Sequence, residues 1–210
     1  MIVTLGEVKP IHACAVVVHS GSGSIDKARS LLMKGVIPLA MRAMIEEQYG
    51  LDKWHEVIAA AGYQSEPFML PISDIADEEV MKLVLAMCQV VPLTLSEFAD
   101  RFGVYWVGTY ALRVYSGFYK SEEVKTARAF LLQMDWVHEA TTKRMKNARP
   151  PRFQYRWESE DILIITYQSH RPLIDLLVGL IRGVGVYFGE ALDVRRLNDT
   201  EVRVHFPAPI

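Results

Sequence analysis

A change of hydrophobic period at Pro150-Pro151 constrains the fold of this chain more than any other feature of its sequence. Before the two prolines, apolar residues recur at the three- and four-residue spacing of helices. After them, Phe153, Tyr155 and Trp157 alternate with polar residues, as in strands with one buried face. The order predicts an α+β fold, in which an N-terminal helical part precedes a mostly antiparallel four-stranded sheet with helices packed on it, and not a doubly wound sheet.

The helical part divides at its capping and helix-breaking residues. Thr94 with Glu97 three positions later forms a capping box, and Pro92 ends the preceding helix. A long helix that begins at Ser121 carries an apolar stripe made of Ala127, Leu131, Met134, His138 and Met145. We expect the other helices from Met33 to Gly50, over 53–61, from an N-cap at Asp77 to Pro92, and over 104–118, with a loop over 67–73.

Two hairpins and one helix are expected in the strand part. A polar turn at 159–161 joins the alternating segment to residues 162–169, and a turn at 198–200 joins 193–197 to 201–206. Residues 172–190 form an apolar helix between the hairpins.

Composition favours one cytoplasmic domain. Half of the 210 residues are apolar and the net charge is −2, which argues against a dedicated binder of nucleic acid or of a membrane surface. Cys14 and Cys88 are far apart in sequence, so neither a disulfide framework nor a structural zinc site is indicated. No apolar run reaches the roughly 20 residues of a membrane span.

The first 32 residues differ from the remainder. Residues 11–18 are apolar and residues 20–24 have the composition of a flexible linker. A signal peptide is poorly supported because no basic cluster precedes the apolar run. We expect residues 1–32 to be a loosely ordered extension, or the product of a start codon upstream of a functional Met33, and residues 33–210 to be the domain.

Tyr167, Ser169 and Arg171 form the most informative motif. In an extended segment they would lie on one side and offer two hydroxyls and a guanidinium to an anion with two carboxylates or phosphates. His138, on the inward face of the long helix, adds an imidazole that can ligate a metal. Together they indicate a haem. The alternatives are a hydrogen-bonded core histidine, and an arginine that caps a helix or forms an ion pair.

Motifs of enzymes are missing from the sequence. Gly183-x-Gly185-x-x-x-Gly189 resembles a dinucleotide fingerprint but lies inside a helix, where close helix packing explains it better. His138-Glu139 lacks the second histidine of a zinc protease, because residue 142 is threonine. We therefore do not expect an enzyme.

Five motifs, in order and at matching spacing, resemble those of the haem nitric oxide/oxygen-binding (H-NOX) family, which includes the haem sensor domain of soluble guanylate cyclase. They are Met33-Lys34-Gly35, Asp135-Trp136-Val137-His138, Pro150-Pro151, Tyr167-x-Ser169-x-Arg171 and Gly179-Leu180-Ile181. The resemblance extends from Met33 to the C-terminus and implies the H-NOX fold.

Position by position, the resemblance implies a site for haem b, iron protoporphyrin IX. His138 matches the proximal iron ligand, Tyr167, Ser169 and Arg171 match the residues that hold the propionates, and Pro151 matches the proline that bends the porphyrin. The positions that match the lining of the haem cavity are Ile37, Trp106, Tyr110, Leu176 and Leu180.

The resemblance also implies which gas the haem would bind. Members that hold oxygen share a distal tyrosine, and the matching residue here is Leu176, which cannot donate a hydrogen bond. We therefore expect a sensor of nitric oxide, with CO as a further ligand. Trp106 keeps an oxygen sensor open as the alternative, because an indole N–H also donates.

Signalling is implied to occur in trans. Release of the iron–histidine bond in the family lets the haem flatten and the histidine helix shift, which biases a two-state switch. A stand-alone member is expected to act on a histidine kinase or a diguanylate cyclase. A haem-free interaction module, a small-molecule carrier and a redox sensor based on Cys88 are the remaining alternatives.

Overall fold

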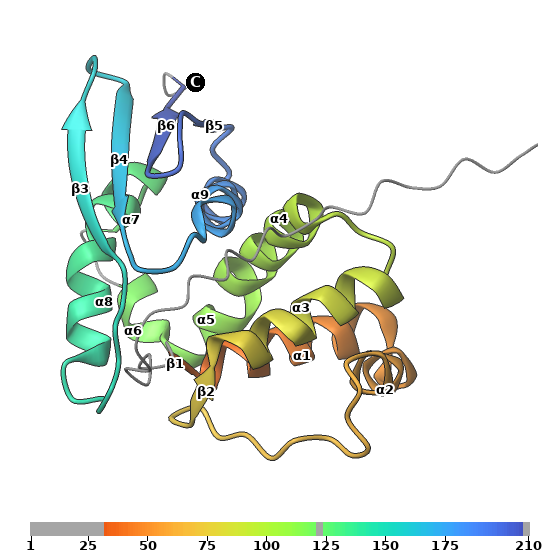
Figure 1. Cartoon of the computed structure of the whole chain (residues 1–210). Coiled ribbons are helices and arrows are strands. Elements are labelled where there is room, and N and C mark those ends of the chain that lie inside the picture. Colours follow the sequence, from red (N-terminus) through yellow and green to blue (C-terminus); the bar gives the residue numbers. More distant parts are fainter. Residues whose placement is uncertain (1–31, 121–123, 208–210) are drawn as a thin grey trace, which may run out of the picture.

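The computed structural model describes residues 32–120 and 124–207, in which helices precede a four-stranded sheet (Figure 1). The helical part consists of β1 (Leu32–Lys34), α1 (Val36–Tyr49), α2 (Leu51–Ala60), β2 (Asp74–Ala76), α3 (Asp77–Val90), α4 (Leu95–Tyr105), the π-helical η1 (Trp106–Tyr110), α5 (Ala111–Val114), α6 (Ser116–Tyr119), α7 (Ala127–Leu132) and α8 (Met134–Thr142). The sheet part consists of β3 (Arg152–Trp157), β4 (Ile162–Gln168), α9 (Ile174–Phe188), β5 (Asp193–Arg196) and β6 (Glu201–His205). The expected α+β order is confirmed.

The sheet has the strand order β3-β4-β6-β5, and every neighbouring pair is antiparallel. Leu163, Ile165 and Tyr167 of β4 point to one face and belong to a buried cluster with α9. Gly189, whose φ of 70° suits glycine, ends α9 as its C-cap. Both expected hairpins and the helix between them are therefore present.

A second buried cluster is built from α1 to α4, and α4 joins it to the sheet part (Figure 1). Helices α4 and α9 cross at glycines: a Cβ on Gly103 would lie 2.1 Å from the Gly179 carbonyl carbon, and one on Gly183 would lie 2.4 Å from the Gly103 oxygen. Side chains cannot occupy these positions, so the two backbones touch. Close helix packing, and not a nucleotide site, accounts for Gly183.

The N-terminal start of the domain differs from the expectation. Residues 32–34 form a strand that pairs with β2, and α1 begins only at Val36. Strands of three residues are too short to show a period, so neither was predicted. The expected boundary after residue 32 falls inside β1, and the expected extension otherwise lies outside the described residues.

The expected long helix is two helices, α7 and α8, which meet at Gln133. The Tyr155 hydroxyl donates to the Leu131 carbonyl (2.9 Å) and accepts from the Asp135 N–H (3.3 Å). Those two backbone groups would otherwise bond to each other, so the phenol interrupts the helix at this turn. The expected helix start at Ser121 lies outside the described residues.

Two smaller expectations were also wrong. Strand β4 ends at Gln168, so Ser169 and Arg171 lie beyond it, and strand alternation does not place them. Asp77 is the first residue of α3 and not its N-cap, which is Ala76, because the Asp77 carboxylate is turned to Arg171. The capping box of Thr94 and Glu97 is confirmed.

Among the described residues, no single helix is long and apolar enough to span a membrane. Only the pair 77–90 and 95–114, bent by 102°, meets that test of length and composition together.

Candidate functional site

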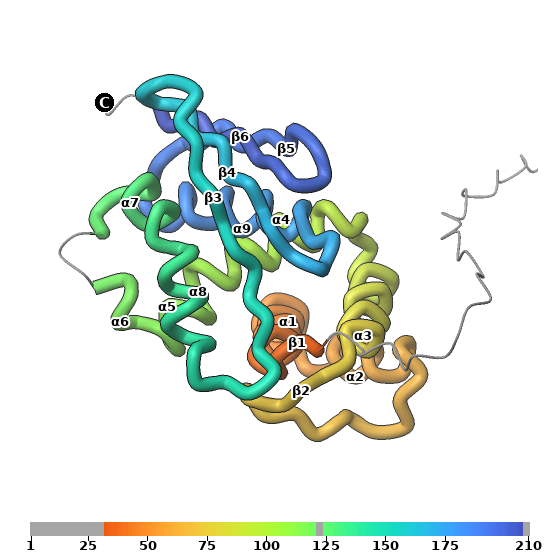
Figure 2. Tube along the Cα trace, turned by 60° about the vertical axis from the view of Figure 1, so that its left-hand side comes forward, coloured from red at the N-terminus to blue at the C-terminus, as the bar shows by residue number. Residues whose placement is uncertain are grey.

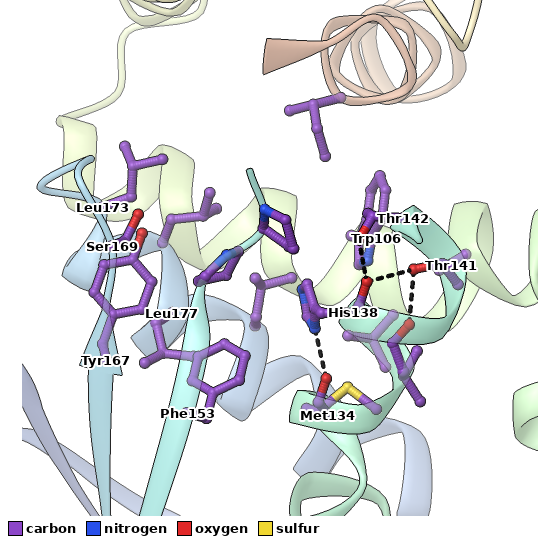
Figure 3. A pocket seen from close by; sticks show the side chains of 18 of the residues that line it. Trp106, Met134, His138, Thr141, Thr142, Phe153, Tyr167, Ser169, Leu173 and Leu177 are labelled. Atoms are coloured by element: carbon purple, nitrogen blue, oxygen red, sulfur yellow. Dashed lines mark hydrogen bonds between the residues drawn. The ribbon is translucent and has the colours of Figure 1, made fainter. Parts of the chain in front are cut away.

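One cavity of about 300 Å³ lies between the helical part and the sheet part, and most of its wall is apolar. Helices α1, α4, α8 and α9, with η1 and strands β3 and β4, contribute to it. Figure 3 shows His138 and Trp106 on one side and Tyr167 and Ser169 on the other. The cavity therefore brings together residues more than 60 positions apart in the sequence, such as Trp106 and Tyr167.

His138 enters the cavity from α8 with a defined tautomer. Its Nδ1 lies 2.7 Å from the carbonyl oxygen of Met134, one turn earlier (Figure 3). A carbonyl can only accept, so Nδ1 carries the proton and Nε2 keeps its lone pair. Burial also lowers the pKa of His138, which keeps the ring neutral. The edge of the ring meets Phe153 at 5.3 Å between centroids, which fixes its orientation.

The beginning of α8 is attached to β3. Asp135 accepts a hydrogen bond from the backbone N–H of Phe153 (2.8 Å) and two from the guanidinium of Arg152 (2.8 and 2.6 Å). The bond to Arg152 lowers the pKa of Asp135. Three hydrogen bonds therefore hold the helix of His138 against the strand that follows the proline pair. Figure 2 shows that α8 and β3 lie side by side.

Tyr167 and Ser169 line the opposite side. Tyr167 is buried, and this burial raises its pKa although the Ser169 hydroxyl and Arg171 act in the other direction. The Ser169 Oγ accepts from the backbone N–H of Arg171 (3.1 Å), which folds the chain back after β4. This turn, and not strand alternation, brings the three residues to one rim.

Arg171 crosses from the sheet part to the helical part. Its Nε donates to Asp77 at 2.6 Å, and its two terminal nitrogens donate to the carbonyls of Leu32 (2.6 Å) and Arg149 (3.2 Å). The expected alternative of an ion pair is thus present, although Arg171 also lines the cavity. The other carboxylate oxygen of Asp77 is buried and has no hydrogen-bond partner among the described residues.

Most of the remaining expected residues meet the cavity. Pro151, Ile37, Trp106, Leu176 and Leu180 line it. Tyr110 is not in its wall; it stacks on Trp106 with 5.6 Å between ring centroids, one layer behind.

Sequence reasoning missed several polar residues in the wall, namely Lys34, Arg149, Tyr115, Tyr119, Thr141 and Thr142. Arg149 directly precedes the proline pair, and this position could have indicated that it lies in the cavity wall. The two threonines follow His138 by one turn of helix, which places them on nearly the same face. The two tyrosines lie in the irregular segment of α5 and α6, where no hydrophobic period predicts which side chains face inward.

A metal cage made of protein side chains is not found: within 32–120 and 124–207, no group of three or more His, Cys, Asp or Glu could hold an ion. One imidazole is enough only where a prosthetic group supplies the other ligands.

Comparisons with known proteins agree with this geometry. The family model described as Haem-NO-binding (HNOB) matches residues 34–196. No match was found among curated proteins.

Among solved structures, a Cs H-NOX mutant with the unnatural residue 4-cyano-L-phenylalanine is 25% identical, with a TM-score of 0.74 over 85% of this chain and 98% of that chain. An oxygen-binding H-NOX domain related to soluble guanylate cyclases, solved as an oxygen complex, is 25% identical, with a TM-score of 0.72 over 84% and 96%. A point mutant of the T. tengcongensis H-NOX, 24% identical with a TM-score of 0.70 over 85% and 100%, shares the fold.

The match to the family model extends over most of the chain and includes all of the cavity wall except Leu32 and Met33. The chain therefore belongs to the Haem-NO-binding (H-NOX) family of haem-based gas sensor domains, which are not themselves enzymes.

Proposed function

We propose that this chain binds haem b in the cavity and senses nitric oxide. The observation that carries the proposal is one apolar cavity that joins a neutral imidazole, His138, to a rim of two hydroxyls and a guanidinium. The haem-binding domain would comprise residues 33–210.

The residues present fit a haem. A porphyrin needs an apolar enclosure, an axial imidazole and donors at its propionate edge. His138 would offer Nε2 as the proximal ligand, because Nδ1 is held by the Met134 carbonyl. When bound, ferrous haem would supply the iron on which the gas binds.

The rim residues and Pro151 would set how the group sits. Tyr167 and Ser169 would donate from their hydroxyls to the propionates, and Arg171 would donate from the N–H groups that Asp77 and the two carbonyls leave free. Pro151, in the cavity wall next to β3, has no N–H and a fixed ring, so it would press against the porphyrin as a rigid surface.

Selection of the gas would depend on the apolar side of the cavity. Leu176, Ile37 and Leu180 offer no hydrogen-bond donor to a bound gas. Nitric oxide, and CO more weakly, require none, whereas oxygen is stabilised by a donor. An apolar wall would therefore favour nitric oxide.

Oxygen binding is the second candidate, and specific residues favour it. Trp106, Tyr115 and Tyr119 line the cavity and carry an indole N–H and two hydroxyls. One of these donors within reach of the gas would give the site an affinity for oxygen.

Signal transfer would use α8. Its first turn is attached to β3 through Asp135, so a movement of His138 would be passed to the proline pair and the sheet. We propose that a separate histidine kinase or diguanylate cyclase reads this change, in the cytoplasmic setting that the composition favours.

Absorption spectra of the reduced, haem-loaded protein test the proposal. They should be recorded without gas, with nitric oxide, with CO and in air. We expect nitric oxide and CO to change the spectrum and air to leave a reduced, gas-free spectrum until slow oxidation sets in. A stable change on admitting air would favour the oxygen candidate, and failure to bind haem would refute both.

A further inference from the structure

Three residues with cationic side chains are among those that line the cavity, in addition to the neutral His138, and they differ in how their charge is balanced. They are Lys34, Arg149 and Arg171. Lys34 pairs with Asp74 at 2.5 Å, and Arg171 pairs with Asp77 at 2.6 Å. Each of these two cations therefore has a carboxylate beside it that opposes its charge.

The pair of Arg171 and Asp77 is also withdrawn from solvent. The two side chains are 12% and 18% exposed, so their attraction is weakly screened. Of the five N–H groups of Arg171, three are directed at Asp77 and at two backbone carbonyls. Arg171 thus retains two donors but contributes almost no net charge to the rim.

Arg149 is different in both respects. Arg149 is among the residues that line the cavity and it is exposed, and no acidic side chain in the described part of the chain pairs with it. Its own carbonyl accepts from the guanidinium of Arg171 at 3.2 Å, so the two arginines share one section of the rim. Arg149 is therefore the cation at this rim whose charge is not balanced by the protein.

We propose that Arg149 binds a propionate of the haem and provides the main positive charge at the propionate edge. This inference depends on the proposed function. A haem presents two carboxylates, and the rim of Tyr167, Ser169 and a neutralised Arg171 offers them donors but little charge. A free guanidinium next to it can pair with a carboxylate through two parallel hydrogen bonds. Arg171 then acts mainly through hydrogen bonding and by holding the Arg149 backbone.

The experiment compares haemin with haemin dimethyl ester, which has the same ring and iron but no propionate charge. Each is titrated into the full chain and into Arg149→Ala, Arg149→Lys and Arg144→Ala, and the absorption of the bound form is followed at low and high salt. Arg144 is the matched control, because it is exposed in the same turn region after α8 but does not line the cavity. The Arg149 carbonyl is kept in every variant, so its bond to Arg171 is retained.

We expect Arg149→Ala to bind haemin about tenfold more weakly, in line with the loss of a charge-assisted pair that solvent partly screens, and Arg149→Lys to recover part of this loss. Affinity for the dimethyl ester should be unchanged, and the difference between the two ligands should shrink at high salt.

Equal haemin affinity of Arg149→Ala and Arg144→Ala would overturn the inference and leave the proposed function intact. An equal loss with both ligands would also overturn it, because the effect would then not involve propionate charge. If the unaltered chain binds haemin no better than His138→Gly does, the proposed function itself fails.

Discussion

The two sides of the cavity are built from different kinds of residue. The cluster of helices α1 to α4 borders it with apolar side chains such as Ile37 and Phe102. The sheet part and α8 contribute the imidazole of His138 and the hydroxyls of Tyr167 and Ser169. The comparison indicates that one region would hold the cofactor and the other would mainly enclose the gas.

The two regions are joined in two ways. Polar contacts connect them at the rim, where Arg171 meets Asp77 and Lys34 donates to the carbonyl of Lys146 at 2.6 Å. Apolar contact connects them where α4 crosses α9 at glycines. We call the side with His138, Tyr167 and Ser169 the holding side, the side bordered by α1 to α4 the enclosing side, and the contacts between them the joint. Substitutions in these three places should give different results.

Loss of the axial ligand should have the largest effect, and it tests the holding side. We expect His138→Gly to lose the spectrum of histidine-ligated haem, because the described cavity wall has no other imidazole, and to regain part of it when imidazole is supplied. The absorption spectrum of the reduced protein, with and without imidazole, is the measurement.

His205→Gly is the control, because His205 pairs with Asp161 on the sheet and does not line the cavity. An unchanged ferrous spectrum in His138→Gly would show that another group ligates the iron and would remove the proposed asymmetry of the two sides.

Disrupting the joint should have the next largest effect. In Gly103→Ala the new methyl would lie 2.1 Å from the backbone of Gly179, so α4 and α9 must separate. We expect a loss of about 3 kcal/mol in the free energy of unfolding, typical of a severe overpacking. Denaturant unfolding gives this value.

Gly108→Ala is the matched control in the adjoining helical turn, because nothing lies within 4 Å of its added Cβ. It should be neutral or slightly stabilising, since alanine favours helices more than glycine does. Equal stability of the two variants would mean that the regions are not joined at this crossing.

The sequence predicted those parts of the fold that have a period or a capping signal. The alternation after Pro151 located the first strand of the first hairpin, and the polar turn at 159–161 located the second. Thr94 with Glu97 located the start of α4. It failed where a distant side chain decides the local structure. The break at Gln133 results from the hydroxyl of Tyr155, about twenty positions away, which no local pattern contains.

The site shows the same division. His138 could be placed on an inward face from its position in an apolar stripe, and the structure confirms that it faces the cavity. The partner of Arg171 could not be predicted, because Asp77 is 94 positions away. In addition, its place just before an apolar helical pattern favoured an N-cap role for Asp77. Arg149 was missed because its proposed role depends on the ion pairs of the other cations, Lys34 and Arg171, which the sequence does not reveal.

The enclosing side is tested by adding a hydroxyl. Leu176 belongs to α9 but packs against the helical cluster, so a change there should affect the gas and not the retention of haem. We expect Leu176→Tyr to release oxygen about tenfold more slowly, the size of one added hydrogen bond. Spectra recorded after mixing with oxygenated buffer measure the release.

Leu176→Phe is the control, because it adds the ring without the hydroxyl. If both variants behave alike, bulk and not hydrogen bonding governs the gas. If the unaltered chain already holds oxygen as firmly as Leu176→Tyr, then Trp106, Tyr115 or Tyr119 provides the donor.

The smallest expected effect concerns the attachment of α8 to β3. Asp135→Asn keeps the shape of the side chain but weakens the bidentate pair with Arg152, and we expect a loss of about 1 kcal/mol of stability. Because the pKa of Asp135 is lowered in the folded protein, its contribution is complete above the ordinary aspartate pKa and is lost as the pH falls through the folded value. The free energies of unfolding of the unaltered chain and of Asp135→Asn should therefore differ at pH 7 and become equal in acid.

Asp193→Asn is the control, because Asp193 pairs with Arg195 on β5, at the edge of the sheet opposite to β3, to which α8 is attached. The attachment matters for the comparison of the two sides because it determines whether His138 moves alone or with β3. The response of the sheet to nitric oxide is followed by amide hydrogen exchange of β3. If Asp135→Asn changes stability but leaves this response unaltered, the movement of His138 must be transmitted through the C-terminal end of α8. The turn after Thr142 would then carry it to Asp74, to which Asn147 donates at 2.8 Å, and the helical part would be the one that responds.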